Sequence, residues 1–293
     1  MTLVGHTMGT PEYRLSEALE LFARLGLEGA EVVWQSGYAS GIDPGASRED
    51  LRALGTAAGR AGVPIVALTP YEDRFNSLDG EERLRALDAY TRALWAADVL
   101  GSRWIRLYGG RFLPGEGDRP AKWEALVDSL RTLGERAERY GVTICVETHF
   151  NTMTDTARNA ADLVRQVGHP SVRVLYDQAN LGFIGAEEWP EALRELAGTI
   201  AYVHVKDFEF TGARRAFAAR DVSHVEEESR IVRSRVVGDG ILPWEDILRA
   251  LRAAGYDGPL SLEYERRWHP QDLPPAAEGM ARAAERIRAW LAR

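Results

Sequence analysis

Residues 123–149, WEALVDSLRTLGERAERYGVTICVETH, contain the pattern that decides the fold. Apolar residues recur at helical spacing in the first part of this stretch and mark one helix face: Trp123, Leu126, Val127, Leu130 and Leu133. Gly141 ends that helix, and Val142–Val146 follows directly as a short β-branched run typical of a buried strand. A helix that leads straight into such a strand predicts one repeating unit of a parallel α/β sheet.

The same alternation extends through the chain in both directions. Eight runs read as strands: Thr2–Gly5, Ala30–Trp34, Pro64–Leu68, Trp104–Leu107, Val142–Val146, Val172–Tyr176, Ile200–Val205 and Leu260–Glu263. Helix boundaries are marked between them by Asp79, Pro243, Gly62, Gly101, Gly168 and Gly255. Eight units in 293 residues predict a single (β/α)8 TIM barrel as one domain, 1–293. The alternative fold is a doubly wound sheet, but such a sheet rarely contains eight units without a recognisable second domain.

A long polar segment, residues 207–242, separates the seventh strand from the helix that begins near Pro243. Its charged and histidine residues include Arg214, Arg215, Arg220, His224, Glu226–Glu228, Arg230, Arg233 and Arg235. We predict a long loop insertion after strand seven, over the carboxyl ends of the strands, where barrel enzymes build their active sites. A functional loop and a solvated or subunit-contact segment both remain open.

Composition excludes several classes of protein. Acidic residues outnumber basic ones 44 to 36, giving a net charge of −8, which disfavours general binding of nucleic acid. The one cysteine, Cys145, fits a reducing compartment, and no signal peptide or membrane-spanning run is visible, so we expect a cytoplasmic protein with no membrane partner. No phosphate-binding glycine motif follows a strand, so no bound nucleotide is expected.

Polar residues fall at the carboxyl ends of four consecutive predicted strands. They are Glu147, Asp177, His204 and Glu263. In a parallel barrel these ends meet at one mouth, and three carboxylates forced together there would repel one another. A divalent cation resolves the repulsion. Three carboxylates and one imidazole suit Mn²⁺, Mg²⁺ or Co²⁺, with Zn²⁺ as a further choice.

The chain resembles the xylose-isomerase-like TIM barrels, a superfamily of sugar (phosphate) isomerases and epimerases, inosose dehydratases and related enzymes. The resemblance covers nearly the whole chain and is sharpest from Gly141 to Glu265. Its markers are Val146-Glu147-Thr148-His149, Tyr176-Asp177-Gln178-Ala179-Asn180, Val203-His204-Val205-Lys206-Asp207, Val237-Gly238-Asp239-Gly240-Ile241 and Gly255–Glu263, with weaker support from Gly29-Ala30-Glu31-Val32-Val33. These markers identify the superfamily better than they identify a substrate.

The resemblance implies a metal-dependent isomerase or epimerase of a sugar or related polyhydroxylated carbonyl compound. Glu147, Asp177, His204 and Glu263 would hold one divalent ion, with Mn²⁺ as the first choice. Glu147 and Glu263 would also be catalytic, because two carboxylates on opposite sides of the substrate can remove a proton beside the carbonyl and return it, through an enediolate. Members of the superfamily are often dimers or tetramers, so a homo-oligomer is a further implication.

Five other residues are candidates for substrate binding. Asn180 stands where ketose 3-epimerases usually carry a histidine, which weakens free-ketose epimerisation as the specific activity. His149 resembles a histidine of other branches that touches substrate or transfers a proton. Lys206 would meet a hydroxyl, carboxylate or phosphate, or else pair with a neighbouring acid. His6 and Trp34, at the ends of the first two strands, would line the pocket or pack in the barrel core.

Three alternatives differ in class from the leading hypothesis. A lyase on the same site, such as a keto-inositol dehydratase or a 3-oxo-glycoside deglycosylase, shares the proton abstraction but then expels a leaving group. An endonuclease-IV-like DNA repair enzyme shares the fold but needs a richer set of ligands for three zinc ions. A non-catalytic sugar-binding barrel would bind metal and ligand without exchanging a proton with solvent.

Overall fold

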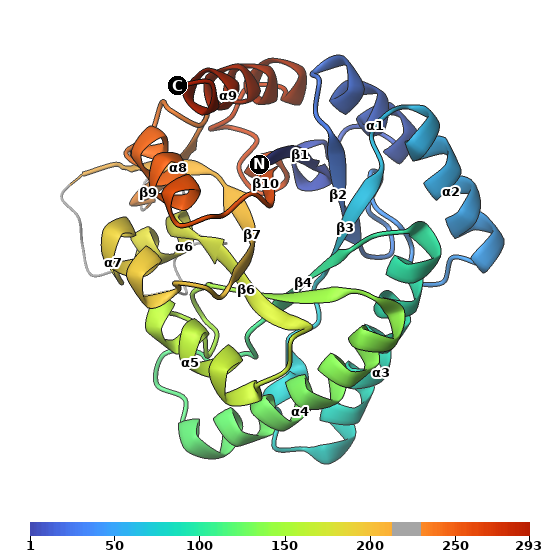
Figure 1. The fold of residues 1–293 in the computed structure, drawn as a ribbon, viewed down its shortest axis with the longest axis vertical. Coiled ribbons are helices and arrows are strands. Elements are labelled where there is room, and N and C mark those ends of the chain that lie inside the picture. The colour runs from blue at the N-terminus through green and yellow to red at the C-terminus, as the bar shows by residue number, and fades with distance from the viewer. Residues whose placement is uncertain (213–229) are drawn as a thin grey trace.

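The computed structural model describes residues 1–212 and 230–293 and contains a closed barrel of parallel strands inside a ring of helices (Figure 1). The barrel strands are β1 (Thr2–His6), β2 (Gly29–Trp34), β3 (Ile65–Pro70), β4 (Trp104–Tyr108), β5 (Thr143–Glu147), β6 (Val172–Asp177), β7 (Ile200–Val205) and β10 (Pro259–Leu262). Their order around the barrel is β1-β10-β7-β6-β5-β4-β3-β2, and β1 pairs with both β10 and β2. The predicted (β/α)8 barrel is confirmed.

The helices lie outside the strands (Figure 1). They are α1 (Leu15–Arg24), α2 (Arg48–Arg60), α3 (Gly80–Leu100), α4 (Arg119–Tyr140), α5 (Ala157–Val167), α6 (Gln178–Ile184), α7 (Trp189–Glu195), α8 (Trp244–Ala253) and α9 (Ala276–Leu291). Two predicted boundary signals have the expected geometry. The Asp79 side chain accepts hydrogen bonds from the backbone N–H groups at the start of α3, and Gly141 ends α4 with a left-handed φ of 65°.

Side chains on each strand alternate between the barrel interior and the helices. On β5, Ile144 and Val146 belong to the apolar core that includes the helices, whereas Cys145 packs with residues of β3, β6 and β7 in a separate cluster inside the barrel. Glu147 lies two residues after Cys145 and therefore points to the same side. The alternation of apolar residues on β5 thus directs the Glu147 carboxylate into the barrel at its carboxyl end.

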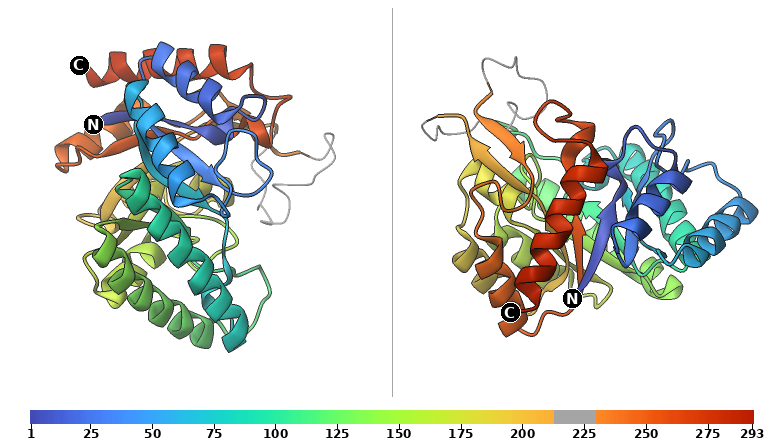
Figure 2. Two further views of the ribbon diagram at one scale, coloured as in Figure 1. Left: turned by 90° about the vertical axis from the view of Figure 1, so that its right-hand side faces the viewer. Right: turned by 90° about the horizontal axis from the view of Figure 1, so that it is seen from above.

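The segment predicted as a loop after strand seven begins and ends with an antiparallel hairpin, β8 (Asp207–Phe210) and β9 (Val232–Arg235). The Asp207 carboxylate accepts backbone hydrogen bonds from Phe208, Gly238, Gly240 and Leu242 and so fixes both ends of the segment. The hairpin lies at the end of the barrel opposite the N-terminus (Figure 2). Residues 213–229, which include Arg214, Arg215, Arg220, His224 and Glu226–Glu228, lie outside the described residues.

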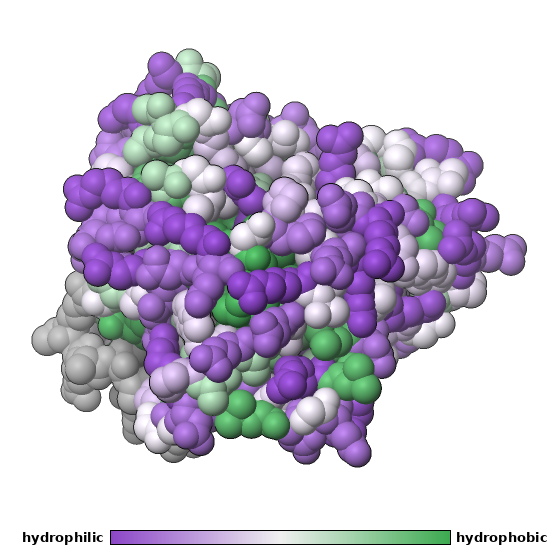
Figure 3. Space-filling view, turned by 60° about the horizontal axis from the view of Figure 1, so that its bottom comes forward, coloured by the Kyte–Doolittle hydropathy of each residue, from purple (hydrophilic) through white to green (hydrophobic). Residues whose placement is uncertain are grey.

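One face of the surface can be judged from its hydropathy. The face drawn in Figure 3 is largely hydrophilic, with hydrophobic residues in small separate groups. Among the described residues, no helix combines the length and the apolar character needed to cross a membrane.

Candidate metal centre

Four polar side chains meet inside the barrel at the carboxyl ends of its strands. Glu147 ends β5, Asp177 ends β6, His204 lies in β7, and Glu263 directly follows β10. The exposed fraction of each is 2% or less. One potential ligand atom from each residue lies within 4.8 Å of the corresponding atoms of the other three. The structure therefore brings together the four residues that the sequence predicts as a metal site.

The two glutamates are held in the same way. Glu147 Oε2 accepts from Arg106 Nε at 2.6 Å and lies 2.5 Å from Nη2, and Glu263 Oε2 accepts from Lys206 Nζ at 2.7 Å. The other oxygen of each, Oε1, lies 3.4 Å (Glu147) and 3.3 Å (Glu263) from His204 Nδ1. Each glutamate thus has one oxygen fixed by a buried cation and one oxygen directed at the space beside His204.

Asp177 follows a related pattern. Its Oδ1 accepts the Asn180 backbone N–H at 3.1 Å, at the start of α6. Its Oδ2 accepts no hydrogen bond from the described residues, although Lys206 Nζ lies 3.0 Å from it. The Asn180 side-chain amide also donates to Glu147 Oε1 at 3.1 Å. Asn180 therefore positions two of the carboxylates.

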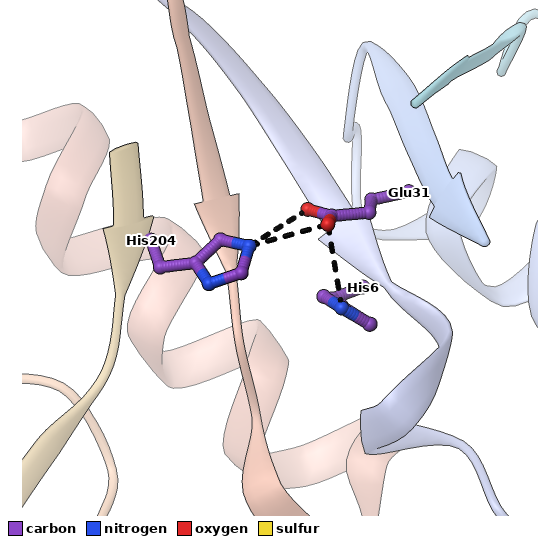
Figure 4. A group of neighbouring side chains, drawn as sticks. All are labelled: His6, Glu31 and His204. Carbon is purple, nitrogen blue, oxygen red and sulfur yellow. Dashed lines mark hydrogen bonds and ion pairs between the residues drawn. The ribbon is translucent and has the colours of Figure 1, made fainter. Parts of the chain in front are cut away.

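His204 directs Nε2 at the Glu31 carboxylate, as Figure 4 shows, and its Nδ1 faces Glu147 and Glu263. Its Nε2 is 3.2 Å from both oxygens of the Glu31 carboxylate, and its Nδ1 has no hydrogen-bond partner among the described residues. We assign a hydrogen to Nε2 because an ionised carboxylate only accepts. Burial lowers the pKa of His204, but the charges of Glu263 and Glu31 raise it well above its ordinary value, so without an ion Nδ1 also carries a hydrogen and faces Glu147 and Glu263. An ion bound between the carboxylates would take the place of that hydrogen, with the Nε2 hydrogen held by Glu31 as in a metal-ligating histidine.

His6, Glu31 and His204 form a second group close enough to hold an ion, but its hydrogen bonds are already satisfied (Figure 4). His6 Nδ1 accepts the Met8 backbone N–H at 3.0 Å, so its hydrogen lies on Nε2, 3.5 Å from Glu31 Oε1. Thr69 Oγ1 donates to the same Glu31 oxygen at 2.5 Å. We therefore interpret this group as support for His204 and the carboxylate side of His204 as the candidate metal site.

The charges in the candidate site are compatible with a bound cation. Burial raises the pKa of Asp177 to about 7, with Lys206 opposing the shift and Glu263 and Glu147 adding to it. Burial would also raise the pKa of Glu147, but the Arg106 guanidinium brings it down to about 2. Ionised carboxylates this close together repel one another, and a divalent ion relieves the repulsion. His204 Nδ1 and Asp177 Oδ2, which make no hydrogen bond within the described residues, and the oxygen-rich donor set fit such an ion.

Two of the predicted substrate-binding residues, His149 and Lys206, differ in their contacts. His149 Nδ1 lies 2.6 Å from the Phe150 carbonyl oxygen and donates to it, so its Nε2 carries a lone pair. Burial lowers the pKa of His149 to about 4 against the attraction of Glu147, which keeps the ring neutral. Lys206 is 6% exposed and pairs with Asp177, Glu263 and Glu265. Of the two roles expected for Lys206 from the sequence, the structure shows the pairing with neighbouring acids.

The two residues predicted to line the pocket face opposite ways. His6 points into the barrel, where its ring centre lies 5.6 Å from that of His204. Trp34 packs in the apolar core that includes the helices and lines a cavity against Tyr90 and Arg92 of α3. The structure therefore brings His6, but not Trp34, into contact with the group around His204.

Two charged residues of the site were not singled out from the sequence. Arg106 is in the middle of β4, and Glu31 is in β2; their exposed fractions are 2% and 0%. A charged residue inside an apolar strand such as Trp104-Ile105-Arg106-Leu107 is the signal that could have identified the first of them.

Comparison with known proteins gives a consistent result. A sequence model of the family described as "Xylose isomerase-like TIM barrel" matches residues 19–290. An inosose dehydratase of Geobacillus thermodenitrificans is 30% identical over 145 residues, which cover 50% of this chain and 48% of that protein. A 3-dehydroshikimate dehydratase of Pseudomonas putida is 28% identical over 251 residues, which cover 85% of this chain and 36% of that protein. The chain thus spans half or less of the length of these two relatives.

A solved structure resembles the fold over the whole chain. The D-psicose 3-epimerase of Clostridium cellulolyticum, crystallised with D-tagatose, superposes with a TM-score of 0.76 at 20% identity, covering 100% of this chain and 99% of the epimerase. At this identity the likeness shows the fold alone.

Proposed function

This chain belongs to the xylose isomerase-like TIM barrel family, and from that premise we propose that it is a divalent-metal-dependent isomerase or epimerase of a sugar or related polyhydroxylated carbonyl compound. One observation carries the proposal. Glu147 and Glu263 direct one oxygen each at His204 Nδ1, with Asp177 beside them. Glu147, Asp177, His204 and Glu263 would hold the ion.

When bound, a divalent cation, with Mn²⁺ as the first choice, supplies positive charge that acidifies a C–H bond next to a carbonyl group. The chain's own residues perform the proton transfer. Glu147 ends β5 and Glu263 follows β10, with β6 and β7 between these strands, and this separation supports a role for the two carboxylates on different sides of a substrate. One carboxylate accepts the proton from carbon, and the other returns a proton to the opposite face in an epimerase. Arg106 and Lys206 orient the two carboxylates.

A lyase on the same site is the second candidate, and a specific observation favours it. His149 lies two residues beyond Glu147, stays neutral and has a free Nε2 lone pair, so it offers an acid–base group besides the two glutamates. In a lyase the His149 Nε2 lone pair would accept the proton from carbon, the electron pair would form a double bond and expel a hydroxyl or glycosyl group, and the protonated Nε2 would return its proton to that group. Two relatives named as dehydratases are consistent with that outcome.

The first test is the metal content of the purified wild type, Glu263→Gln and Glu124→Gln, measured by elemental analysis after incubation with Mn²⁺ and desalting. Glu124 lies on the exposed face of α4 and is the matched control. We expect about one divalent ion per chain in the wild type and the control, and much less in Glu263→Gln. No metal in the wild type, or equal metal in all three proteins, would refute the assignment of the site.

The second test distinguishes the isomerase or epimerase from the lyase. The Mn²⁺-loaded protein is incubated in D₂O with keto-sugars and inososes. Deuterium in the recovered sugar and an isomeric product indicate the isomerase or epimerase. An unsaturated product or a released aglycone indicates the lyase. Absence of exchange with every compound, from a protein that binds metal and sugar, would indicate a non-catalytic barrel.

A further inference from the structure

Arg267 is a partly buried cation near the candidate metal centre that pairs with no acid among residues 1–212 and 230–293. It ends the short helix η5 (Glu265–Arg267), four residues after Glu263. Its Nη2 donates to the neutral Gln35 Oε1 at 2.9 Å, and its Nη1 is buried without a hydrogen-bond partner among the described residues. No carboxylate oxygen of the described residues lies within 4.0 Å of the Arg267 guanidinium nitrogens. Arg106 and Lys206, by contrast, are both paired with acids.

Aromatic rings hold this guanidinium in place. Its central carbon lies 4.4 Å from the ring centres of Tyr38 and Trp268 and 5.4 Å from that of Tyr71. Tyr38 is fixed in turn, because its hydroxyl donates to the Thr7 carbonyl oxygen at 2.8 Å. A planar cation between aromatic faces loses little freedom when it binds a ligand, so its unused donor is pre-organised.

Tyr71 connects Arg267 to the candidate metal centre. Its ring centre is 5.4 Å from the guanidinium carbon of Arg267 and 5.4 Å from that of Arg106, which binds Glu147. The Tyr71 hydroxyl is also buried without a hydrogen-bond partner in the described parts of the chain. Burial raises the pKa of Tyr71, so this hydroxyl remains a donor. Two unused donors therefore lie near Arg106, which holds Glu147 of the candidate centre.

We propose that Arg267 and Tyr71 bind an anionic group, a carboxylate or a phosphate, at the end of the substrate that does not contact the metal centre. Buried donors without partners are costly, and a ligand oxygen carrying negative charge would satisfy both of them. Arginine forks match carboxylate and phosphate oxygens in particular. This inference rests on the proposed function and names its substrate class as acidic sugars or acidic cyclic polyols with a carbonyl group.

The test uses the Mn²⁺-loaded protein and matched pairs of probes with one carbon skeleton: D-fructose with D-fructose 6-phosphate, and D-fructose with D-fructuronate. Binding is measured by calorimetric titration. We expect one anionic probe to bind at least about tenfold more tightly than D-fructose, the difference that a charged hydrogen bond supplies. Preference for the phosphate or for the uronate identifies the source of the charge.

The variants separate the anion site from general electrostatics. Arg267→Gln and Tyr71→Phe should each reduce the anionic preference by about tenfold while leaving D-fructose binding and metal content unchanged. Tyr71→Phe removes only a hydroxyl group. It therefore still tests the anion site if Arg267→Gln does not fold. Arg111→Gln is the control, because Arg111 carries the same charge beyond β4 but lines a different pocket with Arg74 and Lys122.

Failure of this inference is distinguishable from failure of the proposed function. If neither anionic probe binds more tightly than D-fructose, or if Arg111→Gln weakens binding as much as Arg267→Gln, the anion site is wrong. That conclusion holds whatever the deuterium exchange assay shows. If anion binding depends on Arg267 but no probe exchanges deuterium, the anion site stands and the proton-transfer function fails.

Discussion

At the scale of single residues, each of Glu147, Glu263 and His204 has one atom held by a charged neighbour and a second atom directed at the shared space of the candidate site. Glu147 and Glu263 each use Oε2 for a cation and keep Oε1 beside His204. His204 uses Nε2 for Glu31 and keeps Nδ1. A ligand atom that is already oriented by its neighbour needs little rearrangement when an ion binds, so we expect these partners to contribute to the metal affinity of the site.

Glu31 provides the residue-scale prediction. We expect Glu31→Gln to weaken Mn²⁺ binding by about 10- to 100-fold, because a neutral amide no longer fixes the His204 hydrogen on Nε2 or strengthens Nδ1 as a ligand. Mn²⁺ affinity is measured by titration of the metal-free protein, with Glu124→Gln as the control for loss of a surface charge. An unchanged dissociation constant for Glu31→Gln would mean that Glu31 only fills space beside His6 and His204.

At the scale of elements, the strands and their end residues could be predicted because both depend on local pattern. Apolar runs reveal parallel strands, and an acid at the end of such a run stands out. The side that a residue faces also follows from counting. Glu31 and Trp34 are three residues apart on β2, so they point to opposite sides, and Glu31 in the interior places Trp34 against the helices. The same alternation of side chains along β4 and β5 predicts that Arg106 and Glu147 both point into the barrel.

The hairpin of β8 and β9 could not be predicted in this way. Its two strands are separated by residues 211–231, and no periodic pattern links them. The Asp207 carboxylate and four backbone N–H groups hold it together, and backbone donors carry no signature in the sequence. For the same reason the pairing of Tyr71 with Arg267, far apart in the chain, is visible only in the folded structure.

Gly240 provides the element-scale prediction. A Cβ atom at this position would overlap the Asp207 carboxylate and the Phe208 carbonyl oxygen. We expect Gly240→Ala to lower the free energy of unfolding by about 1–3 kcal/mol, the usual cost of overpacking. Gly59→Ala, at an open position in α2, should instead raise it by about 0.5–1 kcal/mol. Urea denaturation measures both, and a stable Gly240→Ala would show that Asp207 is not needed to hold the hairpin.

At the scale of the whole molecule, the candidate ligands lie on neighbouring strands that include the closing one. β10 pairs with β7 on one side and with β1 on the other, so it joins the two ends of the chain into one barrel. Glu263 directly follows β10, and the other three residues lie on β5, β6 and β7. An ion held by all four would therefore connect the closing strand to the middle of the barrel and stabilise the closed form.

We therefore expect metal to raise the stability of the entire barrel. An ion that binds only the folded chain, at a concentration 100 times its dissociation constant, adds about 2.7 kcal/mol to the free energy of unfolding. Thermal unfolding of the wild type should thus shift upward by several degrees when Mn²⁺ replaces a chelator, and Glu263→Gln should lose the shift. If residues 1–293 fold as one domain, as we propose, circular dichroism and tryptophan fluorescence should give one coincident transition. An equal shift in both proteins would place the stabilising ion elsewhere, and separate transitions would mean that the barrel and the carboxyl-terminal closing strand unfold as different units.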